Sequence, residues 1–356
     1  MNRIEQLSQW LEDERCGALI TSEVSRRYLS EYASTDGILL ITKEESYFLI
    51  DARYFDHAKQ QAKNCTVILL TDTGKQLLEL LIKHGIKRLH IESDTLTVRE
   101  LEHYREILHY SELDSGNELS DKLREMRIIK SAEEIALITK AQRIAEKAFE
   151  RLLGTIRAGM TEKQVSALLE YYIMDSGADG ISFDTIAASG INSSVPHAVP
   201  TDKELKEGEF LTLDFGALYD GYHSDMTRTL AVGSVSEQME EVYNAVYSAN
   251  IDAMQAVRAG VGCKVADSVA RSTLNAWNGL DKYFNHGLGH GVGLEIHEEP
   301  RLSQSSGTML RTGMVVTIEP GAYISGKYGV RIEDMVVVTE NGCDNLANVT
   351  KNLIHI

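Results

Sequence analysis

The chain has 356 residues, which exceeds a typical single domain and predicts two domains. With 43% apolar and 25% charged residues, its composition is that of a globular protein. The formal net charge of −17 argues against a nucleic-acid partner, because phosphate binding requires clustered lysine and arginine. No segment approaches the ~18 apolar residues of a membrane span, so no membrane partner is expected.

The cysteines and the N-terminal segment bear on the cellular compartment. Cys16, Cys65, Cys263 and Cys343 are scattered without CxxC spacing, which favours reduced thiols over a disulfide framework. Residues 1–15 carry charges throughout and lack the apolar core of a secretory signal. We therefore expect a cytoplasmic protein.

Helix and strand patterns alternate along the first ~115 residues, which predicts an α/β domain. Helices are expected at 4–14, 52–62, 74–85 and 98–108, and strands at 17–21, 37–42, 46–50, 65–70 and 88–93. The second and third strands form a hairpin that turns at 43–45. None of these strands is followed by a glycine-rich phosphate loop, so a nucleotide-binding role has no support.

A polar, turn-rich stretch at 112–125 is the expected linker between the two domains. Beyond it, Ser131 and Glu134 have the spacing of a capping box at the start of a long helix. Residues 161–164 repeat this device, and two more helices are expected from 236 and from 265. These helices are interleaved with long antiparallel hairpins. The sequence thus predicts an α/β domain over 1–120 and an α+β domain over 126–356.

Two segments of the second domain, 212–230 and 315–338, have the same order of features. Each places an acid at the end of an apolar run, a glycine and a tyrosine close behind it, and a second acid later. The four acids are Asp214, Asp225, Glu319 and Glu333. An acid in an apolar strand is costly unless it is paired or metal-bound. Four such acids in two matched hairpins predict a metal site on a pseudo-two-fold axis.

Three histidines lie between the two segments, at His286, His290 and His297. The first two are four residues apart, but the glycines around them disfavour a helix and predict a strand or loop. Residues 297–301 differ from the zinc-protease motif HExxH, because Arg301 stands at its last position and Pro300 would break the helix. Carboxylates with one imidazole suit a pair of divalent ions such as Mn²⁺, Co²⁺ or Zn²⁺.

In order and spacing, these motifs resemble those of the pita-bread metallopeptidases, in the branch that contains proline dipeptidase and aminopeptidase P. The motifs are LDFG with Asp214, Asp225 eleven residues on, GHGVGLEIHEEP with His290, TIEPG with Glu319 and VRIED with Glu333. Residues 126–138 are similar to the segment that opens the catalytic domain there, and the first 120 resemble a creatinase-like N-terminal domain more loosely. One departure is Leu288, where this family often has threonine. Creatinase shares the fold without metals, so five retained ligands argue against that activity.

The resemblance implies how the five ligands are shared. Asp225 and Glu333 would bridge both ions, Asp214 would complete one site, and His290 and Glu319 would complete the other. Two cations lower the pKa of a bridging water, so a hydroxide near neutral pH is the expected nucleophile.

The resemblance also implies roles for side chains around the metals. Glu319 would shuttle the proton, and His197 and His297 would bind substrate and stabilise the tetrahedral intermediate. His286 would be an outer active-site histidine. Arg331, two residues before Glu333, is expected on the same strand face, where it would brace the metal carboxylates.

Proline has no amide N–H, so a proline-specific site needs an apolar slot. Phe183 and Ile296 are the candidate walls, with core packing as the alternative for Ile296. The resemblance to proline dipeptidases implies that Arg301, which follows HEEP, clamps a dipeptide carboxylate, with a solvated surface arginine as its alternative.

The leading hypothesis is therefore a dinuclear Mn²⁺-type peptidase that hydrolyses Xaa-Pro dipeptides through a metal-bridging hydroxide, and the family resemblance implies a homodimer. Its partners would be short proline-containing peptides. The alternative enzyme is aminopeptidase P, which releases the residue before proline from longer peptides. A non-catalytic binding protein on the same fold is the alternative from another class.

Overall fold

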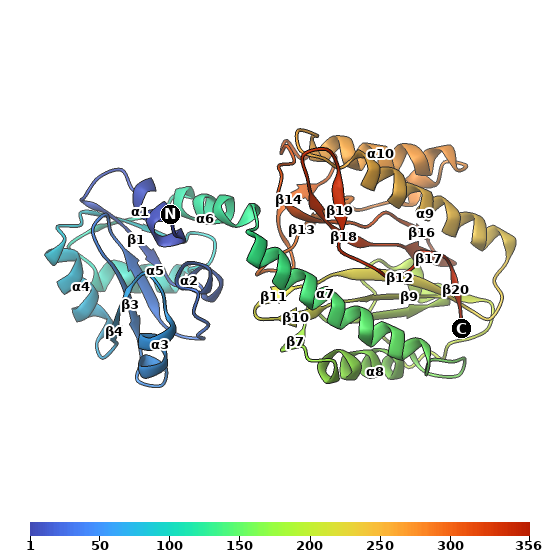
Figure 1. Ribbon diagram of the computed structural model, residues 1–356, viewed down its shortest axis with the longest axis horizontal. Helices are drawn as coiled ribbons and strands as arrows, with labels where there is room; N and C mark the ends of the chain where they lie inside the picture. The colour runs from blue at the N-terminus through green and yellow to red at the C-terminus, as the bar shows by residue number, and fades with distance from the viewer. The chain divides into compact units, whose positions relative to one another are not determined.

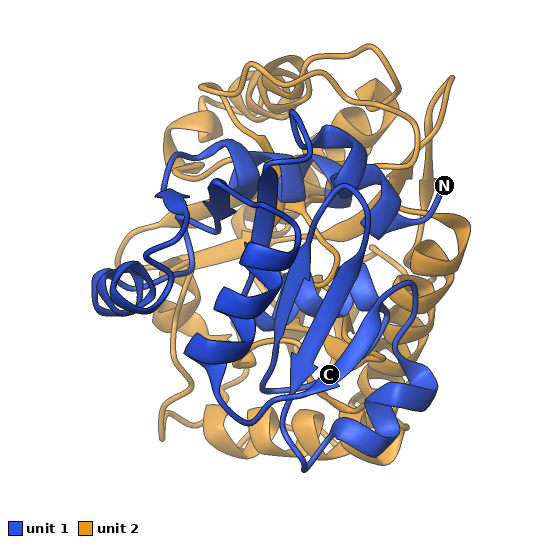
Figure 2. Ribbon diagram, turned by 90° about the vertical axis from the view of Figure 1, so that its left-hand side faces the viewer, with its two compact units in different colours: residues 1–127 blue, residues 128–356 orange.

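The computed structural model describes residues 1–356 and divides into two compact units, Met1–Arg127 and Ile128–Ile356. Figure 2 colours the first unit blue and the second orange. The division falls in the last turn of helix α6 (Glu118–Ile128), so the chain passes from one unit to the next within regular structure.

The prediction of a polar linker at 112–125 is wrong. Strand β6 (Glu112–Asp114) adds to the edge of the first sheet by parallel pairing with β5 (Arg88–Ile91). Helix α6 follows, and it buries Leu119 and Leu123, which are four residues apart and share one face. The segment resembles a linker because it is mostly polar: its edge strand has only three residues, and its helix has few apolar side chains.

The first unit contains one mixed sheet of six strands in the order β4-β3-β2-β1-β5-β6. Its first four strands are β1 (Cys16–Ile20), β2 (Ile38–Ile41), β3 (Ser46–Ile50) and β4 (Thr66–Leu69). The helices are α1 (Arg3–Trp10), α2 (Glu23–Ser30), α3 (Phe55–Gln61), α4 (Thr73–Lys83) and α5 (Val98–Ile107). The predicted hairpin of β2 and β3 is confirmed by their antiparallel pairing. Leu19, Leu40 and Leu49 on adjacent strands are fully buried, as expected for an α/β sheet.

The second unit begins with the two predicted capped helices. Helix α7 (Ala132–Leu153) has the capping box of Ser131 with Glu134, and α8 (Glu162–Asp175) has that of Thr161 with Gln164. The strands that follow are β7 (Gly180–Ile181), β8 (Ile186–Ser189), β9 (Glu209–Phe215), β10 (Ala217–Tyr219), β11 (Tyr222–His223) and β12 (Met226–Val232), with the 3₁₀ turn η1 (Gly190–Ser194) after β8. Both helices pack in one apolar cluster against a sheet of β8, β9 and β12, which β20 (Ile354–His355) joins at the edge beside β12.

A second pair of helices, α9 (Glu237–Ala256) and α10 (Cys263–Ala276), opens the other half of this unit. It continues with η2 (Leu280–Tyr283), β13 (Gly289–Gly291), β14 (Glu298–Leu302), β15 (Val315–Ile318), β16 (Gly321–Ile324), β17 (Tyr328–Arg331), β18 (Asp334–Val338), β19 (Cys343–Asn345) and β20 (Ile354–His355). These helices share a second apolar cluster with Val316 of β15 and Val336 of β18. The prediction of a strand or loop around His290, in place of a helix, is confirmed, because His290 lies in β13.

The two halves of the second unit match in layout, since each packs a helix pair against an antiparallel pair of strands, β9 with β12 and β15 with β18. Figure 1 shows α7 and α8 on one side of the sheets and α9 and α10 on the other. The predicted α/β unit followed by an α+β unit with internal symmetry is confirmed. None of the helices combines the length and apolar composition needed to cross a bilayer.

Candidate metal centre and active site

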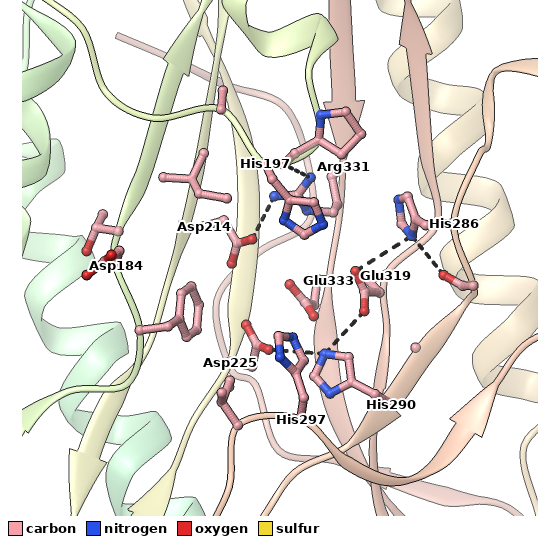
Figure 3. Close-up of a pocket in the computed structure, with 18 of the residues that line it drawn as sticks. Asp184, His197, Asp214, Asp225, His286, His290, His297, Glu319, Arg331 and Glu333 are labelled. Carbon is pink, nitrogen blue, oxygen red and sulfur yellow. Dashed lines mark hydrogen bonds and ion pairs between the residues drawn. The ribbon is translucent and has the colours of Figure 1, made fainter. Parts of the chain in front are cut away.

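A cavity of about 600 Å³ in the second unit gathers the acids and histidines singled out in the sequence. Residues of its wall include Phe183, His197, Asp214, Asp225, His286, His290, Ile296, His297, Arg301, Glu319, Arg331 and Glu333. In Figure 3 the side chains of the four acids point toward one another, with histidines around them. Segments more than 100 residues apart in the chain thus meet in one cavity.

The acids reach this point because each hairpin carries its pair at one end. Asp214 lies on β9 opposite Thr227 of β12, and Asp225 immediately precedes that strand. In the other half, Ile318 of β15 lies opposite Asp334 of β18, so Glu319 and Glu333 flank this pair. Antiparallel pairing therefore holds two carboxylates together in each half.

His290 is held on β13 with one ring nitrogen directed at the acids. Its Nδ1 lies 3.0 Å from the Gly291 carbonyl oxygen, and its Nε2 lies 3.6 Å from Asp225 Oδ2 and 3.4 Å from Glu319 Oε1. Burial lowers the pKa of His290 to about 3, so the ring is neutral. A neutral imidazole with Nδ1–H donated to a carbonyl presents the Nε2 lone pair, as a metal ligand requires.

The glycines beside His290 are required by close backbone approach. A Cβ at Gly289 would lie 2.0 Å from the Thr317 carbonyl oxygen, and one at Gly291 would lie 2.2 Å from that of Glu299. The His290 N–H also donates to Thr317 Oγ1 at 3.1 Å, and this hydroxyl donates to Glu319 Oε1 at 3.1 Å. One threonine thus fixes both an imidazole and a carboxylate.

The donor set fits divalent cations. Ligand atoms of Asp225, His290 and Glu333 all lie within 4.8 Å of one another. Burial and the neighbouring carboxylates raise the pKa of Asp225 and Glu333 well above the ordinary range, and burial raises that of Glu319 to about 8. Asp214 Oδ1 is buried without a hydrogen-bond partner. Clustered, mutually repelling carboxylates with an unpaired oxygen are stabilised by bound cations.

Arg331 lies beside the four acids, but the strand that carries it ends before Glu333. β17 stops at Arg331 and β18 starts at Asp334, so the expected common strand face is wrong. The guanidinium donates to Asp214 Oδ2 through Nη2 at 2.7 Å and to Thr227 Oγ1 through Nε at 3.0 Å. Thr227 Oγ1 in turn donates to Glu333 Oε2 at 2.6 Å. Arg331 therefore contacts one acid directly and the other through a hydroxyl.

The other histidines border the acids. The rings of His297 and His290 are 4.4 Å apart and nearly perpendicular, at 76°. His286 Nδ1 is 3.9 Å from Glu319 Oε2, and its Nε2 is 3.0 Å from the Tyr323 hydroxyl. Burial and the charge of Arg301 lower the pKa of His297, whose ring is exposed on the cavity wall.

Several residues of the site carried little or no sequence signal. Tyr323 bonds both His286 and Arg331, and its only signal is the tyrosine that recurs after the first acid of each hairpin. Asp184, Pro196, Ala198, Val199 and Pro200 also line the cavity. No pattern marks them, because their role depends on where the loop folds.

A second group of possible metal ligands lies in the first unit, at Glu12, Cys16 and His90. It is already charge-compensated. Arg88 donates to Glu12 at 3.3 Å and to Asp114 at 2.8 Å. His90 contacts the same two carboxylates at 3.1 and 3.3 Å. This group is an ion-pair network, and the guanidinium would repel a cation.

Clustered carboxylates on two matched hairpins, with the His290 imidazole on β13 beside them, indicate a metal-dependent hydrolase. Residues 136–340 match the model of metallopeptidase family M24, and residues 3–126 match the Creatinase/Prolidase N-terminal domain. The chain belongs to metallopeptidase family M24, and it is an enzyme of that class. The expected pita-bread fold and creatinase-like N-terminal domain are thereby confirmed.

Relatives and solved structures of this family match the chain over its full length. The chain is 38% identical to an Xaa-Pro dipeptidase from Pyrococcus horikoshii over 357 residues, covering 99% of this chain and 98% of that protein. The structure of an Xaa-Pro dipeptidase from Bacillus anthracis superposes with a TM-score of 0.95 at 39% identity, covering 99% of both chains. The structure of an X-Pro aminopeptidase from Thermotoga maritima superposes with a TM-score of 0.92 at 34% identity, covering 100% of both chains.

Proposed function

We propose that the chain is a dinuclear-metal peptidase that hydrolyses Xaa-Pro dipeptides. Asp214, Asp225, His290, Glu319 and Glu333 would hold two divalent ions, with Mn²⁺ expected and Co²⁺ or Zn²⁺ as alternatives. The names of full-length relatives support the substrate class, and the convergent carboxylates support the ligand set. When bound, a pair of such ions activates a water and polarises a carbonyl oxygen.

The chain's own residues would handle the proton and the developing negative charge. Oε1 of Glu319 accepts from Thr317, and Oε2, which lies 3.9 Å from His286 Nδ1, would be the oxygen that accepts a proton and passes it to the leaving nitrogen. His197 and His297 lie on the cavity wall, where an imidazole N–H would donate to the carbonyl oxygen as it becomes an oxyanion.

The observation that carries the dipeptide proposal is Arg301. Its side chain lines the same cavity as the acids, and the guanidinium has no hydrogen-bond or ion-pair partner in the chain. A free cation at this position matches the C-terminal carboxylate of a bound dipeptide. Phe183 and Ile296 on the same wall are half-buried and supply apolar surface for a proline ring.

An aminopeptidase P activity is the second candidate, because the Thermotoga maritima structure superposes over the whole chain. Parallel hydrolysis of Ala-Pro and Ala-Pro-Ala by the Mn²⁺-loaded protein decides between them. Faster turnover of Ala-Pro is expected. Preference for Ala-Pro-Ala would replace the dipeptidase proposal with the aminopeptidase, and no cleavage of either with Mn²⁺, Co²⁺ or Zn²⁺ would overturn both.

Two further properties stay predictions. A cytoplasmic location is supported by four free cysteines, which suit a reducing compartment. A homodimer is expected from the family resemblance in the sequence, and sedimentation of the purified protein tests it.

A further inference from the structure

One loop of the second unit carries a large part of the cavity wall. It runs from Ser189, the last residue of β8, through η1 to Thr201, and it includes His197. Pro196, Ala198, Val199 and Pro200 of the same loop also line the cavity. The histidine itself is exposed, so its placement depends on how the ends of the loop are held.

Both ends of this loop are bound to a single carboxylate, that of Glu162 in the first turn of α8. Glu162 Oε1 accepts from the Ser189 N–H at 2.6 Å and from its hydroxyl at 2.9 Å. Glu162 Oε2 accepts from the Thr201 N–H at 3.0 Å and from its hydroxyl at 2.6 Å. The Asn192 amide bonds both oxygens, at 3.1 and 3.0 Å. Two points twelve residues apart are thereby fixed against one side chain.

Glu162 is not needed to cap its own helix. The capping box of α8 consists of Thr161 and Gln164, which satisfy each other's backbone N–H groups. The Glu162 side chain is therefore free to point away from α8 toward the loop, where it is fully buried. A buried carboxylate is retained when hydrogen bonds compensate for lost hydration, and here every bond comes from the loop.

The middle of the loop is tied to the candidate metal centre. The Pro196 carbonyl oxygen, next to His197, accepts from Arg331 Nη1 at 3.2 Å. The same guanidinium donates to Asp214. Near the start of the loop, Ser193 Oγ accepts from the Gly329 N–H at 2.9 Å. With its ends fixed on Glu162, the loop can hold the His197 ring at one position relative to Asp214.

We infer that Glu162 is a positioning residue, which orders the 189–201 loop so that His197 reaches the substrate carbonyl in the active site. The inference rests on the proposed peptidase function only for the role of His197; the anchoring of the loop is independent of it. Glu162 touches neither the substrate cavity nor the acids, so it acts through the loop alone.

The test compares Glu162→Gln, His197→Ala and the double variant in Mn²⁺-dependent hydrolysis of Ala-Pro. In Glu162→Gln an amide NH₂ faces loop donors, so kcat is expected to fall roughly ten- to a hundredfold, the scale for a misplaced catalytic group. In the His197→Ala background the same change should cost less than about twofold, because only coupled residues depart from additivity. Losses that multiply would overturn the positioning role.

Glu134→Gln is the matched control. Glu134 is also a buried carboxylate near a helix N-terminus, but it bonds Ser131 and Tyr222 and lies outside the loop. We expect this variant to lower the melting temperature with kcat within about threefold of wild type, as for a change remote from the site. A loss as large as that of Glu162→Gln would mean that any buried-carboxylate change reduces turnover, against the inference.

Amide hydrogen exchange of the 189–201 segment separates this inference from the function. Faster exchange is expected in Glu162→Gln and unchanged exchange in Glu134→Gln, even if wild type cleaves no Xaa-Pro peptide. If Glu162→Gln does not fold, Thr201→Val keeps the carboxylate and removes the Thr201 hydroxyl, which donates to Glu162 at 2.6 Å and accepts from the Asn192 amide and the Lys203 N–H, each at 3.2 Å. Thr201→Val should also speed amide exchange of the 189–201 segment and show non-additive kinetics with His197→Ala, with both effects smaller than in Glu162→Gln. Wild-type exchange and additive kinetics in Thr201→Val would then overturn the inference.

Discussion

Arg331 Nη2 donates to Asp214 Oδ2 at 2.7 Å, while the other oxygen of that carboxylate is buried without a partner. The guanidinium thus occupies one oxygen of Asp214 and leaves the other for a cation. The guanidinium also donates to the hydroxyls of Thr227 and Tyr323 and to the Pro196 carbonyl oxygen, so its N–H groups bind several acceptors at once. Burial opposes the charge, but Tyr323, Asp214 and Glu333 raise the pKa of Arg331, which keeps it cationic.

From this contact we predict that Arg331→Lys weakens metal binding by about 10–100-fold, the usual cost of losing a residue that orients a ligand. A lysine retains the charge but cannot reach several acceptors at once. Titration of the metal-free protein with Mn²⁺ measures the change. Arg311→Lys, at an exposed position of the same unit, is the control and should leave the affinity unchanged. Equal affinities in both variants would mean that Arg331 does not orient Asp214.

Asp225→Asn should remove at least one ion per chain and abolish activity. Asp225 is buried within 4.8 Å of ligand atoms on His290 and Glu333, and the amide loses both the charge and a ligand oxygen. Metal analysis after dialysis gives the ion content, with the exposed Asp344→Asn as control. Two retained ions with full activity would refute the assignment of Asp225 as a bridging ligand.

Patterns along the chain identify the acids well, because Asp214 and Glu319 interrupt or end apolar strands whose direction fixes where they meet. The same holds for His290, whose flanking glycines mark a backbone that passes close to other strands. Such signals are local, since they follow from strand periodicity and from the space a Cβ needs. They predict the α+β class and the four acids with a histidine beside them, whereas the roles of His197 and His297 follow from the family resemblance alone.

Glu162 and Tyr323 could not be predicted in the same way. Glu162 is an ordinary first-turn acid in the sequence, and its role arises from donors 27 and 39 residues away. The expected placement of Arg331 beside Glu333 failed because β17 ends between them. The position of a turn within two residues depends on tertiary packing, so spacing alone gives no answer.

His297→Ala should lower kcat by about 10²–10³ while both ions remain bound, the range for loss of a donor to a tetrahedral intermediate. Its ring packs 4.4 Å from that of His290 but is exposed on the cavity wall, as suits a substrate contact. Steady-state kinetics on Ala-Pro and metal analysis of the same sample measure both effects. Loss of an ion in this variant would make His297 a ligand instead.

The Glu162 carboxyl should make the stability of the folded protein depend on pH in a defined direction. Burial acts to raise its pKa, but hydrogen bonds from Thr201 and Ser189 outweigh burial and hold the pKa below its ordinary value of 4.5. A carboxyl whose pKa is lower in the folded than in the unfolded state stabilises the protein at pH above its unfolded-state pKa. This stabilisation is lost as the pH falls through the folded-state pKa. The difference in unfolding free energy between wild type and Glu162→Gln should therefore be largest near neutral pH and shrink below about pH 4.5. Denaturant unfolding at pH 7 and at pH 4 measures it, and a difference that grows in acid would contradict the assignment.

Arg301→Ala tests the length of the substrate. A guanidinium that clamps the free carboxylate of Ala-Pro contributes a charge-assisted bond of ~1.5–3 kcal/mol. Its loss should raise KM for Ala-Pro roughly ten- to a hundredfold, since 1.4 kcal/mol is tenfold in binding. Amidated Ala-Pro lacks the carboxylate, so wild type should bind it poorly and the variant should lose little more. The unpartnered guanidinium on the cavity wall means that its removal leaves no buried charge behind, and stability should be unchanged. Equal losses on both substrates would show that Arg301 shapes the cavity and does not read the carboxylate.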